Sequence, residues 1–161
     1  MKLIYMFSFL LVVSVLSSCA SNISSNKSVQ DMIAAANENS KYVSVMNKFM
    51  VAAKNKNITE MLALTSASSI KMYGLSSYEN NYKNILIPEI TSCNKIYTNK
   101  NIMLTSKEAT RIGKGYIYQK ICTKEKRKPS IINIKVLNDN GHIAVAGTIV
   151  FKPNKKMENI R

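Results

Sequence analysis

The dipeptide Asn140-Gly141 constrains the fold most, because it lies between two runs of alternating apolar and polar residues. Asn-Gly is typical of a two-residue type I′ turn, which joins antiparallel strands into a hairpin. With that turn Asp139 faces His142 and Val136 faces Val145. The register predicts four further pairs: Ile134 with Gly147, Ile132 with Ile149, Lys135 with Ala146, and Asn133 with Thr148. A slip of one residue would exchange the two faces of the hairpin, so the turn and the alternation together predict this pairing.

Before Pro88 the spacing of apolar residues is helical. Apolar residues three and four apart predict one kinked helix or two consecutive helices over residues 29–54, with Ser28 as the first cap and Ser40 as a break or second cap. Asn57 or Thr59 can start a short helix, and residues 66–69 are expected to form a loop. Ser76 and Glu79 have the spacing of a capping box, which predicts a helix that ends near Leu86, before the proline.

After Pro88 the period becomes that of strands. The expected strands cover residues 90–97, 102–107, 116–123, 130–137 and 142–151. Helices first and strands afterwards predict an α+β fold, in which N-terminal helices pack on a curved antiparallel sheet.

A family resemblance follows from this order of elements and from the segment Phe49-Met50-Val51-Ala52-Ala53-Lys54, followed by Asn57-Ile58-Thr59-Glu60-Met61-Leu62. Both resemble the nuclear-transport-factor-2-like (cystatin-like) superfamily over about residues 30–152. The resemblance implies a cone-like roll, with the sheet wrapped around a long helix. We expect the space between helix and sheet to be filled by residues such as Met46, Phe49, Met50, Ile134, Val145 and Ile149.

The N-terminus has the features of an export signal. Met1-Lys2 is followed by the apolar run Leu3–Leu16, which is too short to span a bilayer comfortably and suits a signal peptide. The sequence Leu16-Ser17-Ser18-Cys19 resembles the bacterial lipobox. The resemblance implies lipidation of Cys19 and cleavage before it; an ordinary secretory signal with an incidental cysteine is the alternative.

These features predict the organisation of the chain: a signal peptide (1–18), a lipidated Cys19 with a flexible Ser- and Asn-rich tether (19–28), one α+β domain (29–153) and a basic tail (154–161). The protein would be anchored in a bacterial cell envelope by several acyl chains, which together give stable binding to the bilayer. Ala20 resembles the residue after the cysteine in lipoproteins sorted to the outer membrane of a Gram-negative host.

Two cysteines, Cys93 and Cys122, remain once Cys19 is lipidated. An even pair in an exported chain predicts a disulfide, and two buried thiols are the alternative. A redox-active pair is not expected, because the sequence has no Cys-x-x-Cys motif.

The formal net charge of +14 comes mainly from 20 lysines, with only three arginines. Lys, Asn and Ile, the residues of A- and T-rich codons, are all abundant, so we attribute much of this charge to genomic composition. Specific nucleic-acid readers rely on Arg, so no nucleic-acid partner is expected. The basic loop at residues 124–129 is either a solvated turn or a contact for anionic lipid or glycan phosphates, made by Lys124, Lys126, Arg127 and Lys128.

The expected strand at residues 116–123 is partly apolar on both faces. Tyr116 and Tyr118 share one face with Lys120, and Ile117 and Ile121 share the other. Either both faces are covered, or one is a contact surface, for which Tyr116 and Tyr118 are the candidates because tyrosine is enriched at interfaces.

No catalytic, metal or cofactor motif is present in the sequence. His142 is the single histidine, beside a turn. Glu60, Glu79 and Glu89 lie near the expected helix-to-sheet junction, where each has a structural role available: an early-helix charge, a capping partner and a surface residue. A water-filled cavity that held Glu60 or Glu89 against a tyrosine would instead favour an enzyme.

The sequence therefore predicts a membrane-anchored envelope lipoprotein that acts as a non-catalytic binding or assembly module. Two alternatives remain open. One is a small-ligand carrier or superfamily enzyme that uses the cone between helix and sheet. The other is a structural subunit of a secretion or envelope complex.

Overall fold

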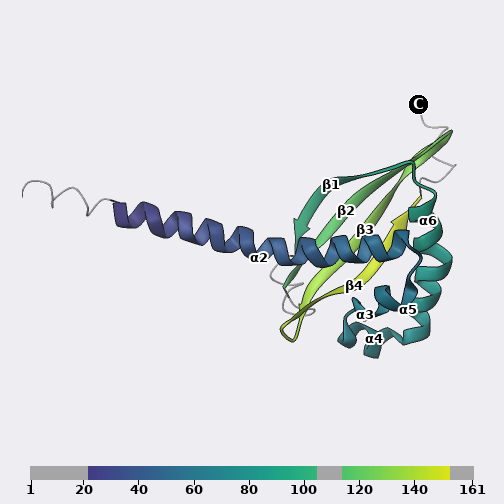
Figure 1. The fold of residues 1–161 in the computed structure, drawn as a ribbon, viewed down its shortest axis with the longest axis horizontal. Coiled ribbons are helices and arrows are strands. Elements are labelled where there is room, and N and C mark those ends of the chain that lie inside the picture. The colour runs from purple at the N-terminus through teal and green to yellow at the C-terminus, as the bar shows by residue number, and fades with distance from the viewer. Residues whose placement is uncertain (1–21, 105–113, 153–161) are drawn as a thin grey trace, which may run out of the picture. The chain divides into compact units, whose positions relative to one another are not determined.

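The computed structural model describes residues 22–104 and 114–152 (Figure 1). The chain divides into two compact units, residues 1–39 and residues 40–161. Helix α2 (Asn22–Lys54) runs from the first unit into the second. Every other helix and strand described below belongs to the second unit.

Helix α2 begins before its predicted start at Val29. Residues 22–28 are helical, so the prediction of a flexible tether there and of an N-cap at Ser28 is wrong. This segment has neither Gly nor Pro, and lengthening an existing helix needs no new nucleus. The helix also passes Ser40 unbroken. Met32 and Ile33, expected to face a core, are exposed.

The later turns of α2 carry the predicted core stripe. Tyr42, Met46, Phe49, Met50 and Ala53 are all buried. Their spacing of three and four residues places them on one face of the helix. This part of the helix prediction is confirmed.

The first two short helices after α2 each start with a side-chain cap. Helix α3 (Ile58–Ala63) begins where Asn57, one of the two predicted starts, accepts a hydrogen bond from the backbone N–H of Glu60. Helix α4 (Ala67–Tyr73) begins where the Ser66 hydroxyl accepts from the backbone N–H of Ser69. The predicted loop at residues 66–69 is therefore wrong, because Ser66 acts as an N-cap.

The next helical segment passes through Pro88, where the sequence predicted an end. Helix α5 (Leu75–Asn81) starts without a side-chain cap, so the predicted capping box of Ser76 and Glu79 is wrong. A π-helical turn, η1 (Tyr82–Leu86), leads into α6 (Ile87–Thr91). Pro88 falls in the first turn of α6, where a missing N–H is tolerated, so the helical path continues.

A four-stranded antiparallel sheet completes the α+β fold, in the order β1-β2-β3-β4. Its strands are β1 (Lys95–Met103), β2 (Gly115–Lys124), β3 (Arg127–Asp139) and β4 (His142–Phe151). The last three match the predicted strands. The first two predicted strands are replaced by β1, because Ile90 belongs to α6; residues 105–107 lie outside the described residues.

The β3–β4 hairpin has the predicted turn but only part of the predicted register. Asp139 pairs with His142 and Val136 with Val145, as expected. Beyond Val136 the register shifts by one residue, because Ala146 forms a β-bulge in β4. The remaining predicted pairs are therefore wrong; the observed pairs are Ile134 with Thr148, Ile132 with Val150, Lys135 with Gly147 and Asn133 with Ile149.

One face of the sheet packs into the core of the second unit. Tyr118, Ile132, Ile134, Val136 and Val145 are fully buried. They form one cluster with the buried stripe of α2 and with Tyr82 and Leu86 of η1. The predicted core is thus confirmed except for Ile149, which the bulge turns to the other face, where it is 57% exposed.

Candidate functional site

The second face of the sheet, which we call the open face, presents partly or fully exposed side chains from all four strands. By alternation it consists of Tyr97, Lys100, Ile102, Ile117, Gln119, Ile121, Ile131, Asn133, Lys135, Gly147, Ile149 and Phe151. One row across the strands is apolar throughout: Tyr97, Ile121, Ile131 and Phe151. Ile149 and Phe151 are more than half exposed.

An amide ladder crosses the middle of the open face. The Asn99 side chain donates a hydrogen bond to Gln119, and Gln119 donates to Asn133 at 3.3 Å. Lys100 and Lys135 are the charged residues of the face as defined above. The face therefore combines one apolar row, neutral amides and positive charge.

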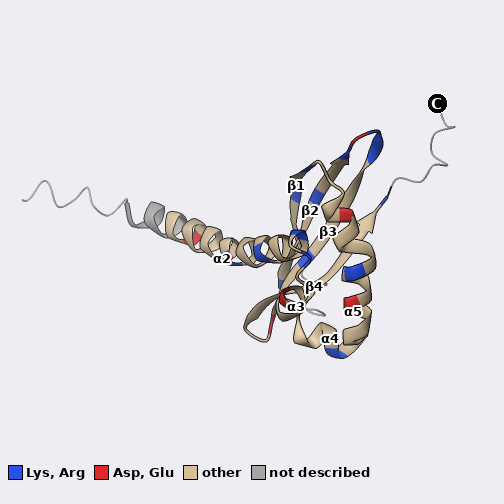
Figure 2. Ribbon diagram, turned by 45° about the vertical axis from the view of Figure 1, so that its right-hand side comes forward, with Lys and Arg blue, Asp and Glu red and all other residues tan. Residues whose placement is uncertain are grey.

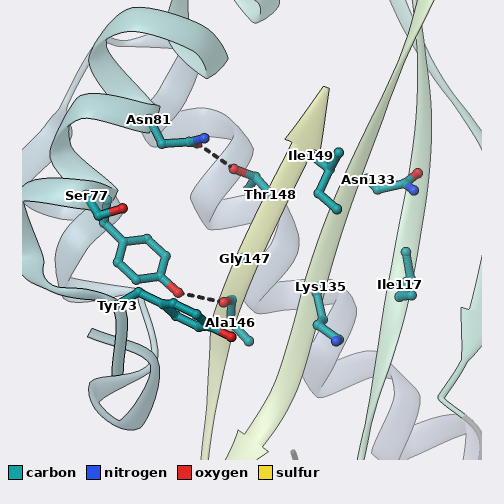
Figure 3. Close-up of a pocket in the computed structure, with 11 residues that line it drawn as sticks. Tyr73, Ser77, Asn81, Ile117, Asn133, Lys135, Ala146, Gly147, Thr148 and Ile149 are labelled. Carbon is teal, nitrogen blue, oxygen red and sulfur yellow. Dashed lines mark hydrogen bonds between the residues drawn. The ribbon is translucent and has the colours of Figure 1, made fainter. Parts of the chain in front are cut away.

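The β4 edge of the sheet is covered by the preceding helices. The Tyr78 hydroxyl donates to the Ala146 carbonyl at 2.7 Å. The Thr148 hydroxyl donates to the Asn81 side chain at 2.9 Å (Figure 3). Further along, the Val145 backbone exchanges hydrogen bonds with Leu64 and Ser66. These contacts hold α4 and α5 beside β4.

A hollow of about 360 Å³ lies where these helices meet the open face. Figure 3 shows its wall of helical residues, Tyr73, Ser77 and Asn81, opposite side chains of β2, β3 and β4. Gly147 leaves the strand side open, because a Cβ atom there would meet nothing within 4 Å. Glycine inside a strand often marks a bulge or a place where a ligand approaches closely.

A second hollow of about 280 Å³ adjoins the first, and Tyr73, Lys135 and Ala146 line both. It continues to Asp139 at the end of β3. We call the two hollows together the groove. The groove follows β3 from Asn133 to Asp139, so it is elongated along the strand.

The two charged groups of the groove floor differ in their surroundings. Asp139 accepts hydrogen bonds from the Ser68 hydroxyl and backbone N–H and from the Ser66 hydroxyl. These bonds, of which those from Ser68 have the largest effect, lower the pKa of Asp139 below its ordinary value. Lys135 is half-buried and has no ion-pair partner among the described residues.

The tyrosines predicted as contacts lie on the covered face. Tyr118 is fully buried, and burial raises its pKa to about 12. Tyr116 is half-buried and packs edge-on against Tyr42, with ring centroids 5.1 Å apart. Both tyrosines therefore contribute to packing, and the exposed side of β2 is the side of Ile117.

The basic loop divides into one structural lysine and three exposed cations. Lys124 lies 2.6 Å from the Glu89 carboxylate, with its side chain 12% exposed. Lys126, Arg127 and Lys128 are exposed at the turn between β2 and β3, where Figure 2 shows basic residues in blue.

Glu89 is buried, so its predicted surface position is wrong. It accepts a hydrogen bond from Ser130 and ion-pairs with Lys124 and, at 3.4 Å, with Lys152. Burial alone would raise its pKa, but the hydrogen bonds from Lys124 and Ser130 and the two positive charges lower it. Glu60 is exposed and accepts a hydrogen bond from Asn57. Among the described residues, neither carboxylate has a tyrosine as its partner.

The remaining predicted residues are placed as follows. Cys93 and Cys122 lie within disulfide distance, with Cα atoms 5.4 Å apart, as the sequence indicated. His142 is exposed beside the turn. Cys19 and the tail at 154–161 lie outside the described residues. Within residues 22–104 and 114–152 no cluster of three or more His, Cys, Asp or Glu side chains could hold a metal ion.

Sequence reasoning missed the groove, although two signals for it were present. Gly147 interrupts a mainly apolar strand, and Lys135 lies between Ile134 and Val136 on a mixed face. Neither signal identifies a groove without the position of α4 and α5, which depends on the helical path through Pro88.

Comparison with protein-family models, with curated proteins and with solved structures finds no match to this chain. Among the described helices, none combines the length and the apolar character that crossing a membrane would require.

Proposed function

We propose that this protein is a lipid-anchored binding or assembly module of a bacterial cell envelope, which holds a partner against the open face of its sheet. The open face with its groove is the observation that carries the proposal. Contiguous exposed apolar surface rimmed by polar groups is typical of interaction sites. Ile149 and Phe151 are the most exposed apolar side chains of this face.

The location in the envelope rests on the N-terminal sequence. The short apolar run and the lipobox-like Leu16-Ser17-Ser18-Cys19 support export, lipidation at Cys19 and, in a Gram-negative host, sorting to the outer membrane. A disulfide between Cys93 and Cys122 fits an oxidising compartment.

The helix-on-sheet order of the second unit supports the resemblance to the nuclear-transport-factor-2-like superfamily as a proposal. A carrier or enzyme of that kind would use the space between α2 and the sheet. In this chain the side chains of Phe49, Tyr118 and Ile134 are fully buried there. A partner on the outside of the sheet therefore agrees better with the packing. A structural subunit of an envelope or secretion complex is our second candidate function.

A separate contact with anionic lipid or glycan is supported by the turn between β2 and β3. Lys126, Arg127 and Lys128 are exposed together at one end of the sheet. Each cation near an anionic bilayer contributes about 1 kcal/mol to binding. This contact would assist the anchor without using the open face.

The proposal is tested by placing a photo-crosslinking amino acid at Ile149 or at Phe151 in the full chain, in intact bacteria. Val51 on α2 is the matched control, because it is an apolar side chain of similar exposure, 55% against 57% for Ile149. We expect adducts of discrete mass from the two sheet positions and none from Val51. Absence of adducts at the sheet positions, or equal labelling at Val51, contradicts the proposal.

A further inference from the structure

The groove has a length and a charge that select one class of ligand. We propose that it binds an extended peptide segment of a partner protein, with an acidic side chain of that segment paired to Lys135. The inference rests on the proposed function, in which the open face holds a partner, and adds the chemistry of the segment that is held.

The shape of the groove fits an extended chain. It follows β3 from Asn133 to Asp139 and is bordered by α4 and α5 on the other side. A strand rises about 3.3 Å per residue, so this distance of about 20 Å matches about six residues of extended peptide. The middle of the groove is open because Gly147 has no side chain.

The edge of β4 is not the docking position. Hydrogen bonds from Tyr78 to Ala146 and between Val145, Leu64 and Ser66 already use this edge. The segment would therefore lie on the face of the sheet, and side-chain contacts would decide its affinity. Tyr73, Ile117 and Ile149 supply apolar surface for neighbouring side chains of the peptide.

The charge of Lys135 favours a single carboxylate in the part of the groove around it. Lys135 lies at the junction of the two hollows and has no ion-pair partner among the described residues. Asp139, at the far end, is satisfied by Ser66 and Ser68. A charge-assisted hydrogen bond from Lys135 to a carboxylate would complete the floor of the groove.

Other anionic ligands fit less well. Phosphate groups are usually held by several cations, by bidentate Arg or by the N–H groups of a helix N-terminus, and the groove floor offers one lysine. The cluster of Lys126, Arg127 and Lys128 that suits lipid phosphates lies around the start of β3, outside the groove. One lysine near the apolar side chains of Tyr73, Ile117 and Ile149 matches an acidic residue flanked by aliphatic or aromatic residues.

The inference is tested with an arrayed hexapeptide library in which every peptide occurs in three versions, with Glu, Gln or Lys at the third position. The protein used is the full exported chain, and fluorescence anisotropy measures the affinities of the best binders. We expect the Glu versions to bind about tenfold more tightly than the Gln versions, with a difference that falls as salt concentration rises.

Variants show whether Lys135 is responsible. Lys135→Met should abolish the preference for Glu, and Lys135→Glu should favour the Lys versions. Gly147→Val should weaken all three versions, because its side chain fills the hollow. Lys100→Met, which removes the other lysine of the open face outside the groove, should leave the preference unchanged; thermal unfolding confirms that each variant is folded.

Several outcomes overturn the inference. They are an array without binders, equal affinity for Glu and Gln versions, a preference that persists in Lys135→Met, and occupation of the groove by phosphatidylglycerol vesicles or glycan fragments instead of peptides. If Ile149 still crosslinks to a partner in cells while the array has no binders, only the peptide inference fails. If neither occurs, the proposed function fails as well.

Discussion

The amine of Lys124 lies 2.6 Å from a carboxylate oxygen of Glu89, in a buried site that joins helix α6 to strands β2 and β3. Ser130 donates a hydrogen bond to the same carboxylate from β3. A lysine that the sequence placed in a basic contact loop therefore holds the helices to the sheet. The pair also predicts how the stability of the fold depends on pH.

Glu89→Gln should lower the free energy of unfolding at pH 7 by about 3 kcal/mol, because it removes one partner of a buried ion pair. The folded pKa of Glu89 is lowered from 4.5, so its stabilising contribution is complete above that value and is lost as pH falls towards the folded pKa. Chemical denaturation between about pH 3 and pH 7 measures this. The native protein should lose stability at the acidic end, whereas Glu89→Gln should lose less.

Glu125→Gln is the matched control, because Glu125 is exposed at the neighbouring turn. Its free energy of unfolding should stay within about 0.5 kcal/mol of the native value. A Glu89→Gln protein as stable as this control would show that the buried pair contributes nothing.

The disulfide should contribute to stability through the loop that it closes. Cys93 and Cys122 are 29 residues apart, which corresponds to about 3.5 kcal/mol in the chain-entropy description. The double variant Cys93→Ala, Cys122→Ala should have a lower melting temperature than the native protein. A reducing agent should lower the melting temperature of the native protein and leave that of the double variant unchanged. Free-thiol titration of the unfolded, unreduced exported protein checks the bond directly, and finding two reactive thiols would show that it does not form.

Two glycines of the sheet should respond oppositely to alanine. A Cβ atom at Gly115 would lie 2.2 Å from the Val136 carbonyl oxygen, whereas one at Gly147 would meet nothing within 4 Å. Gly115→Ala should therefore destabilise the fold by about 2 kcal/mol through overpacking. Gly147→Ala should be neutral or slightly stabilising, since it lowers the entropy of the unfolded chain. Equal unfolding midpoints for the two variants in urea would contradict this geometry.

Cys19→Ser should prevent lipid labelling and leave the precursor uncleaved before position 19. The reason is chemical, because the thiol is the expected acceptor of the lipid. Metabolic labelling with a fatty acid and mass measurement of the exported chain test this, with Cys93→Ala as the control that keeps Cys19. Unchanged acylation of Cys19→Ser would remove the basis for the proposed anchor.

Replacing Lys126, Arg127 and Lys128 together by Gln should weaken binding of the unlipidated chain to phosphatidylglycerol vesicles by at least about tenfold at low salt. The control replaces Lys54, Lys56 and Lys71, which are also exposed, and so removes the same charge elsewhere. Vesicle sedimentation measures the difference. Equal losses in both variants would show that only net charge matters and that the turn is a solvated one.

The fold class and most of the core could be predicted because they depend on local patterns. The stripe of Tyr42, Met46 and Phe49 and the alternation of Ile132 and Ile134 each bury one face of an element. The Asn140-Gly141 turn sets the register near itself for the same reason. The register beyond Val136 depends on the bulge at Ala146, which alternation alone does not encode.

The candidate site could not be predicted, because it depends on contacts between distant segments. Strand β2 is partly apolar on both faces, so only the position of α2 decides that Tyr118 is covered and that Ile117 is open. The burial of Glu89 likewise depends on Ser130, which is 41 residues further along the chain. Pro88 normally favours a helix end, and the π-helical turn before it reverses that expectation.

The bulge at Ala146 decides which side chains of β4 beyond Val145 are exposed. If Ala146 paired opposite Lys135 without a bulge, strict alternation along β4 would turn Ile149 inward and Thr148 and Val150 outward. Deleting Ala146 would remove the bulge and leave Ile149 on the open face. Substitutions on the outer surface can thus accumulate at little thermodynamic cost, whereas loss of the bulge with Ala146 retained would exchange the two faces of β4 beyond Val145. Divergent copies of such a chain would be expected to vary in sequence on this surface and to keep the bulge, or to lose it only together with one residue of the strand.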